Sequence, residues 1–155
     1  MKNPIILFSI ILAILGFQPA SAQEPDKATV KQLIDSRDFV FIPQSVSPMS
    51  GGTRQLTPDF EFRINRDTIY SYLPYFGRAY TTMPGEGGIS FTSTSFEYKT
   101  KDRKKKGWEL TIRPKDVRSV RSMNFTLFEN GYATLFVNSD HRQPINFYGY
   151  IRKAE

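Results

Sequence analysis

Strict alternation of apolar and polar side chains is the feature that most constrains the fold of this chain. Phe60, Phe62 and Ile64 alternate with charged or polar residues, and the same period of two recurs as far as Ile151. This period predicts strands with one buried face. Asn130-Gly131 between two such runs predicts a hairpin, because both residues tolerate positive φ. No repeating strand–helix–strand pattern is present, which excludes parallel α/β folds.

One short helix precedes the strands. Asp26 is placed to cap a stretch ending at Arg37, in which Val30, Leu33 and Ile34 form one apolar stripe. The predicted fold is all-β: a single antiparallel β-barrel or barrel-like sandwich of about eight strands, with the N-terminal α-helix closing one end or face. The expected strands cover 39–41, 60–64, 69–73, 89–98 with a bulge or tight turn between Phe91 and Phe96, 108–112, 123–127, 133–137 and 145–151.

The first 22 residues have the pattern of a cleaved signal peptide. Lys2 precedes an apolar run from Ile5 to Phe17, and Ala20-Ser21-Ala22 ends the segment. The run is shorter than the ~20 apolar residues of a membrane-spanning helix. We therefore expect an exported protein, periplasmic or secreted, and not an integral membrane protein. A flexible lead-in at 23–27 and one β-rich domain at 28–155 would follow cleavage.

Composition excludes several kinds of chemistry. The chain has no Cys and one His, so disulfides, thiolate metal sites, cysteine nucleophiles and multi-histidine metal sites are excluded. No calcium-loop motif occurs, and we expect no cofactor and no metal. His141 lies in a segment, 138–144, whose Asn, Ser, Asp and Pro are typical of a turn. The glycine-rich pieces 50–52 and 84–88 lack the setting of a phosphate-binding loop and are interpreted as turns.

Carboxylates leave one enzymatic alternative open. Two acids in one cleft are enough for glycoside hydrolysis. Glu61, Glu97 and Glu109 lie on expected strands, but each takes the outward place in its alternation. Outward strand acids usually serve solubility, and this favours a binding protein over a hydrolase.

A basic run between two strands is the most conspicuous charge feature of a chain with formal net charge +6. It is expected at the tip of a hairpin. One interpretation is contact with an anionic surface such as lipid head groups or acidic glycans; the other is a solvated tip that preserves solubility. Export disfavours nucleic acid as the partner. The six cations are Lys99, Lys101, Arg103, Lys104, Lys105 and Lys106.

Aromatic residues occupy the second, non-core face of several expected strands. Ordinary solvent-facing positions would carry Lys, Glu and Thr. Either both faces are covered, or an aromatic surface binds a ligand or a protein. Pro74 and Gly77 are expected to bracket a chain reversal, with Tyr75 and Phe76 folding back as plugs. The candidate ligand-binding residues are Tyr70, Tyr72, Tyr75, Phe76, Arg78, Tyr132, Phe136, Tyr148 and Tyr150.

The stretch from Tyr70 to Ala79, Tyr-Ser-Tyr-Leu-Pro-Tyr-Phe-Gly-Arg-Ala, resembles a family of small exported bacterial proteins known as domain of unknown function 4251. Ile89-Ser90-Phe91, Trp108-Glu109-Leu110 and the Asn130-Gly131 hairpin add to the resemblance, which covers roughly residues 28–152. It implies an exported β-rich domain and brings no activity and no site residues.

Two functions of different classes follow. The first is an exported non-catalytic binding module for an apolar or amphipathic small molecule or a cell-envelope partner. The second is a carboxylate-dependent hydrolase of envelope glycans. The hydrolase requires two acids about 5 to 9.5 Å apart in one cleft, whereas the binding module requires a concave aromatic-lined site without them.

Overall fold

The computed structural model describes residues 25–80 and 87–154, so the expected signal peptide and part of the second glycine-rich piece lie outside the described residues. Within these ranges one helix precedes ten strands. The elements are α2 (Lys27–Ser36), β1 (Asp38–Pro48), β2 (Arg54–Gln55), β3 (Glu61–Asn65), β4 (Thr68–Pro74), β5 (Gly88–Ser93), β6 (Phe96–Asp102), β7 (Trp108–Pro114), β8 (Ser122–Leu127), β9 (Tyr132–Asn138) and β10 (Ile145–Arg152).

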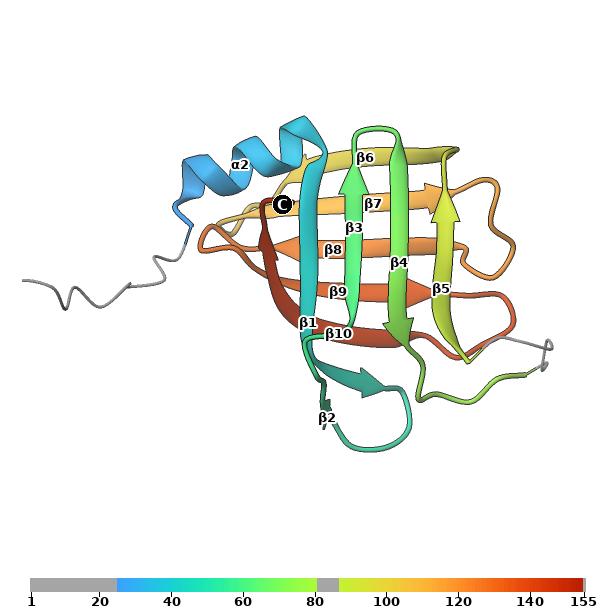
Figure 1. The fold of residues 1–155 in the computed structure, drawn as a ribbon. Coiled ribbons are helices and arrows are strands. Elements are labelled where there is room, and N and C mark those ends of the chain that lie inside the picture. Colours follow the sequence, from blue (N-terminus) through green and yellow to red (C-terminus); the bar gives the residue numbers. More distant parts are fainter. Residues whose placement is uncertain (1–24, 81–86, 155) are drawn as a thin grey trace, which may run out of the picture.

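The strands form one antiparallel sheet that curls into a nearly closed barrel. Their order is β5-β4-β3-β1-β10-β9-β8-β7-β6, and the two-residue β2 pairs with β1 beside this path. In Figure 1 the layer of β1, β3, β4 and β5 crosses the layer of β6 to β10 at a steep angle. The all-β prediction is confirmed. The strand number exceeds the expected eight because β2 was not anticipated and because 89–98 is two strands rather than one.

The phase slip before Phe96 is a tight turn that joins the two edges of the sheet. Thr94 and Ser95 connect β5, at one end of the strand order, to β6 at the other. Asp116, in the loop after β7, holds this turn by accepting hydrogen bonds from the Ser93 hydroxyl and from the backbone N–H groups of Thr94 and Ser95 at 3.0 and 3.3 Å. The Asp116 side chain therefore fixes the corner at which the two edge strands of the nearly closed barrel meet.

The joint between the two layers is the pairing of β1 with β10. Its register shifts between Pro43 and Ser45, which leaves Gln44 as the extra residue of a β-bulge. Gly149 lies opposite, where any Cβ would overlap the backbone carbonyl oxygen of Ile42. A glycine at this position therefore allows the two backbones to approach closely.

Large apolar side chains fill the barrel interior. The ring of Phe125 lies 6.2, 5.4 and 5.3 Å from the rings of Phe39, Phe41 and Phe62, all of them buried. These centroid distances are in the range of favourable aromatic packing. The interior is thus a packed core, and concave space for a ligand must lie on the outside. One expected core residue, Phe60, lies before β3 and packs outside the barrel, 5.5 Å from the ring of Tyr72.

The helix packs across one end of the barrel as predicted. Its stripe of Val30, Leu33 and Ile34 is buried, and the Asp26 side chain accepts a hydrogen bond from the Thr29 backbone N–H at 2.8 Å. Hydrogen bonding by Thr29, through its side chain and then through this backbone N–H, lowers the pKa of Asp26. Figure 1 places α2 across the end of β1 and near β6, and the Tyr98 hydroxyl donates to the carbonyl oxygen of Ile34 at 2.7 Å. In the described part of the chain, no helix has the length and apolar character needed to cross a membrane.

Candidate functional site

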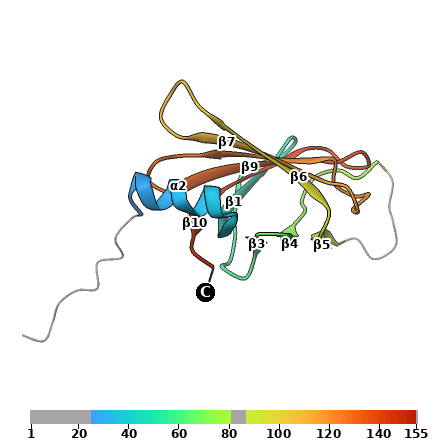
Figure 2. The ribbon, with the colours of Figure 1, turned by 90° about the horizontal axis from the view of Figure 1, so that it is seen from above.

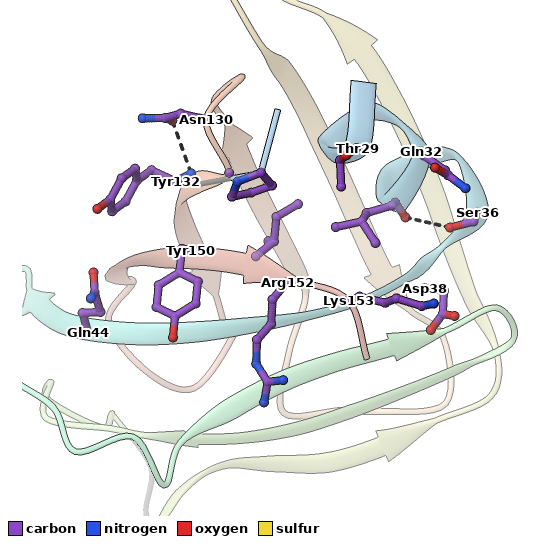
Figure 3. Close-up of a pocket in the computed structure, with 14 residues that line it drawn as sticks. Thr29, Gln32, Ser36, Asp38, Gln44, Asn130, Tyr132, Tyr150, Arg152 and Lys153 are labelled. Carbon is purple, nitrogen blue, oxygen red and sulfur yellow. Dashed lines mark hydrogen bonds between the residues drawn. The ribbon is translucent and has the colours of Figure 1, made fainter. Parts of the chain in front are cut away.

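A groove of about 700 Å³ runs between α2 and the sheet on the outside of the barrel, and we call it the helix groove. Small-molecule sites typically measure about 300 to 1,000 Å³. Figure 3 shows Thr29, Gln32 and Ser36 on the helix side, with Tyr150 and Tyr132 on the sheet side. The groove is therefore of ligand size and combines the first element of the chain with its last.

Local backbone features place the groove's polar side chains. Gln44 is the bulged residue of β1, so it leaves the strand pairing and lies exposed beside Tyr150 (Figure 3). At the far side, Gly131 adopts φ of 84° in the hairpin between β8 and β9. The Asn130 side-chain oxygen there accepts a hydrogen bond from the backbone N–H of Tyr132 at 3.4 Å. A bulge and a glycine turn thus hold two amide side chains at the rim.

The floor and rim of the helix groove differ in polarity. Leu33 and Ile151 are buried and supply an apolar floor. The rim carries amides, hydroxyls and charged groups, with the phenol rings of Tyr132 and Tyr150 between them. Tyr150 pairs with Tyr132 across β10 and β9. An apolar floor with a polar aromatic rim suits an amphipathic molecule. The polar rim residues are Thr29, Gln32, Ser36, Asp38, Gln44, Asn130, Tyr132, Tyr150, Arg152 and Lys153.

The predicted aromatic residues do not meet in one cavity. Tyr132 and Tyr150 line the helix groove. A second concavity of about 490 Å³, which we call the aromatic corner, is lined by Tyr72, Tyr75 and Phe76 together with Phe60 and Gly88.

The remaining members of the predicted set lie elsewhere. Tyr70 lies on the outer face of β4 and is exposed. Tyr148 and Phe136 lie on the outer face of β10 and β9. Arg78 is exposed. The outward phase of the strand tyrosines is as predicted, but their convergence on one cavity is not observed.

Of the two aromatic residues expected to fold back after β4, Tyr75 does so and Phe76 does not. The Tyr75 hydroxyl lies 2.8 and 3.0 Å from the carbonyl oxygens of Arg78 and Gln143, and burial raises its pKa. The guanidinium of Arg142 lies over the Tyr75 ring, 4.9 Å from its centroid. Phe76 does not fold back, since it is 38% exposed and packs under Arg54 instead.

Arg142 is a buried residue that the sequence analysis missed. It is 6% exposed, and its guanidinium donates to the carbonyl oxygen of Gly88 at 2.7 Å. Arg142 also bridges to Ala79, and the neighbouring His141 carbonyl accepts from the Tyr80 backbone N–H at 2.8 Å. The segment from 138 to 144 therefore ties the β4 loop to the end of the barrel. A turn composition gives no signal for such a role.

The basic run forms a hairpin, as predicted, but only part of it is the tip. Lys99 and Lys101 belong to β6 itself, and the turn begins at Arg103. Figure 2 shows this hairpin projecting from the body. Trp108 and Tyr98, at the base of the hairpin, are not available as interfacial anchors: Trp108 is 5% exposed, and Tyr98 is held against the helix.

A basic cleft of about 860 Å³ separates the hairpin tip from the start of α2. Its cations are Lys27, Lys31, Arg103, Lys104 and Lys106. Three acids line it as well, and they are engaged or exposed: Asp26 caps the helix, Glu129 lies 2.7 Å from the Lys27 ammonium, and Asp102 ends β6. On the helix side of the cleft both lysines are ion-paired, Lys27 with Glu129 and Lys31 with Asp35, so the hairpin carries most of its positive charge.

The three glutamates on the predicted strands face outward. Glu61, Glu97 and Glu109 lie outward on β3, β6 and β7, as predicted. The pKa of Glu97 is lowered because the ammonium groups of Lys99 and Lys115 lie close to it. Within residues 25–80 and 87–154, no group of three or more His, Asp and Glu side chains is arranged to hold a metal ion.

Comparison with known proteins identifies the family of this chain and a solved structure with a similar fold. No curated protein matches the chain. The chain is similar to the structure described as a DUF4251 family protein from Bacteroides eggerthii DSM 20697, at 17% sequence identity and a TM-score of 0.66. The likeness covers 86% of this chain and 91% of that one, and at this identity it shows the fold alone. The family model described as Domain of unknown function (DUF4251) matches residues 21–151. The chain therefore belongs to the DUF4251 family.

Proposed function

We propose that this protein is an exported, non-catalytic binding module that holds an amphipathic small molecule in the helix groove. The observation that carries the proposal is the contrast between a packed barrel interior and an outer groove of about 700 Å³ with an apolar floor. The ligand has an apolar body for Leu33 and Ile151 and a polar or anionic head for the rim. Arg152 and Lys153 supply positive charge there, against one carboxylate, Asp38.

The carboxylate count of the helix groove supports binding rather than hydrolysis. Glycoside hydrolysis needs two carboxyl groups on either side of the scissile bond. Among the described residues that line the groove, Asp38 is the one acid. Turnover of glycan or ester substrates by the purified protein, lost on replacing one or two acids, would reverse this ranking.

A fluorescent amphiphile tests the proposal directly. The probe is 1-anilinonaphthalene-8-sulfonate, which joins an apolar ring system to an anionic head. We expect saturable binding to the folded protein, weakened several-fold in Tyr150→Ala because one aromatic wall is lost. Thr29→Trp tests the same groove in the opposite way: an indole on the exposed helix face fills the space and should weaken binding, while the backbone N–H of residue 29 still donates to the Asp26 cap.

A matched control separates the groove from exposed tyrosine in general. Tyr70→Ala also removes an outward tyrosine ring from a strand, but Tyr70 does not line the groove. This variant is expected to bind the probe as the parent does. Near-ultraviolet circular dichroism of each variant excludes binding to a loosened core. Equal probe binding by the parent, Tyr150→Ala and Thr29→Trp, or no binding by the parent, would refute the proposal.

A further inference from the structure

The outer face of β8, β9 and β10 has an unusual composition for a solvent-facing surface. Outward positions alternate with the buried core residues of these strands. One row across the sheet is Ser45, Tyr148, Thr134 and Thr126, which are successive partners on β1, β10, β9 and β8. Tyr148 is 42% exposed, so its ring is accessible from outside.

A second row lies beside the first and repeats its chemistry. It runs through Ser47, Asn146, Phe136 and Asn124. Tyr148 and Phe136 lie diagonally opposite each other on neighbouring strands. At this spacing aromatic side chains are long enough to come close to each other. We call these two rows the neutral face. Its aromatic rings are thus set among hydroxyl and amide groups on a rigid sheet.

On the described strands, the neutral face lacks both charged and aliphatic side chains. No outward residue of β8, β9 or β10 is charged, apart from Arg152 at the end of β10. None is aliphatic either. The chain as a whole is 23% charged, and charges reappear on the next strand at Glu109 and Arg113 of β7. The neutrality is therefore local to this part of the sheet.

The chemistry of the neutral face selects a class of ligand. Tyr and Phe rings offer flat apolar surfaces, while Asn side chains both donate and accept hydrogen bonds and Ser and Thr hydroxyls do the same. A neutral sugar presents the complement: an apolar face of C–H groups and a periphery of hydroxyls. Charged ligands find no counter-ion on this face. We propose that the neutral face binds a neutral oligosaccharide chain lying across β8, β9 and β10.

A protein partner fits this face less well. The centres of protein–protein interfaces are enriched in Tyr, Phe, Met and Arg and are apolar, but here no Met, Leu, Ile, Val or Arg accompanies the two rings. The proposal does not depend on the helix groove, because neither Tyr148 nor Phe136 lines it. The two sites therefore succeed or fail in separate experiments.

Affinity electrophoresis of the folded chain tests the proposal. The native gels contain dextran, xylan or galactomannan as neutral polysaccharides, and polygalacturonate as an anionic one. We expect at least one neutral polysaccharide to retard the protein. Tyr148→Ala and Phe136→Ala are expected to weaken that retardation about tenfold, the scale of one aromatic stacking contact. Tyr148→Phe, which keeps the ring, retains most of the binding.

Controls keep each outcome decisive. Tyr70→Ala removes a similarly exposed ring on β4 and leaves retardation unchanged. Unchanged melting of Tyr148→Ala shows that the fold is intact. No retardation by any neutral polysaccharide, retardation by polygalacturonate alone, or equal loss in Tyr70→Ala overturns the proposal. So does a dimer on gel filtration that Tyr148→Ala dissociates, since the face would then be a self-interface.

Discussion

At the residue level, Gly149 has no room for a side chain where β10 pairs with β1 beside the bulge. A Cβ there would overlap the Ile42 carbonyl oxygen. Because the overlapped atoms belong to the backbone, no rotamer change can relieve the overlap. Gly149→Ala is expected to lower the free energy of unfolding by about 1 to 3 kcal/mol, as overpacked sites do. Urea denaturation measures this. Gly52→Ala is the control: no atom lies within 4 Å of its Cβ position, and its unfolding should match the parent's.

Asp116 makes stability depend on pH at the corner between β5 and β6. Hydrogen bonds from the Ser93 hydroxyl and the Thr94 backbone N–H lower its pKa from the ordinary value of 3.8. A carboxyl with a lower pKa in the folded state stabilises the fold above its unfolded pKa, and this stabilisation is lost as pH falls through the folded pKa. Asp116→Asn is therefore expected to be less stable than the parent at pH 7, and the difference should shrink below about pH 4.

Urea midpoints of the parent and Asp116→Asn at neutral and acidic pH test this dependence. Asp59→Asn serves as the matched control, because Asp59 is exposed in the loop before β3. A constant difference between the parent and Asp116→Asn across this range would mean that the carboxylate charge does not stabilise the corner.

At the element level, the β6–β7 hairpin presents several cations at one projecting tip. Exposed charges are screened within about 8 Å at physiological salt, so they must act together at close range. Each contributes on the order of 1 kcal/mol near an anionic surface. The full chain is expected to bind vesicles containing anionic lipid weakly, and salt should abolish the binding. Replacement of four tip cations by Ser should remove it: Arg103, Lys104, Lys105 and Lys106.

The chain offers a control of equal charge at the other end of the same strand. Four exposed cations lie near the end of β7 and in the loop that follows, and replacing them by Ser changes the net charge by the same amount. These are Arg113, Lys115, Arg118 and Arg121. Vesicle sedimentation should then show binding by the control variant and none by the hairpin variant. Equal binding by both variants would assign the hairpin to solubility alone.

At the level of the whole molecule, one ring couples the two layers of the barrel. Phe125 of β8 contacts the rings of Phe39 and Phe41 of β1 and Phe62 of β3. Phe125→Ala is expected to cost about 3 to 5 kcal/mol in the free energy of unfolding, because a buried ring leaves a cavity. Denaturant titration measures it. Phe128→Ala, which removes a ring that is 38% exposed, should cost far less; similar losses would contradict a core centred on Phe125.

Local sequence information was sufficient for the helix, for most of the strands and for the orientation of most side chains. The period of two predicted an all-β fold, and the hairpin predicted at Asn130-Gly131 joins β8 to β9. Asp26 caps the helix as predicted. These features depend on near neighbours in the chain. Phe60 and Phe76 were placed wrongly because each lies just outside a strand, where alternation no longer determines which face a residue takes.

The sequence by itself therefore determined which side chains face inward and which face outward, including the outward tyrosines. Only the tertiary structure decided which of them become neighbours. Tyr132 and Tyr150 meet Gln32 of the helix and Gln44 of the bulge, whereas Tyr70 and Tyr72 lie on another layer. The physical reason is that alternation is set by each strand's own pleat. Strand order, the close pairing of β1 with β10 at Gly149 and the docking of α2 depend on contacts between segments far apart in the chain.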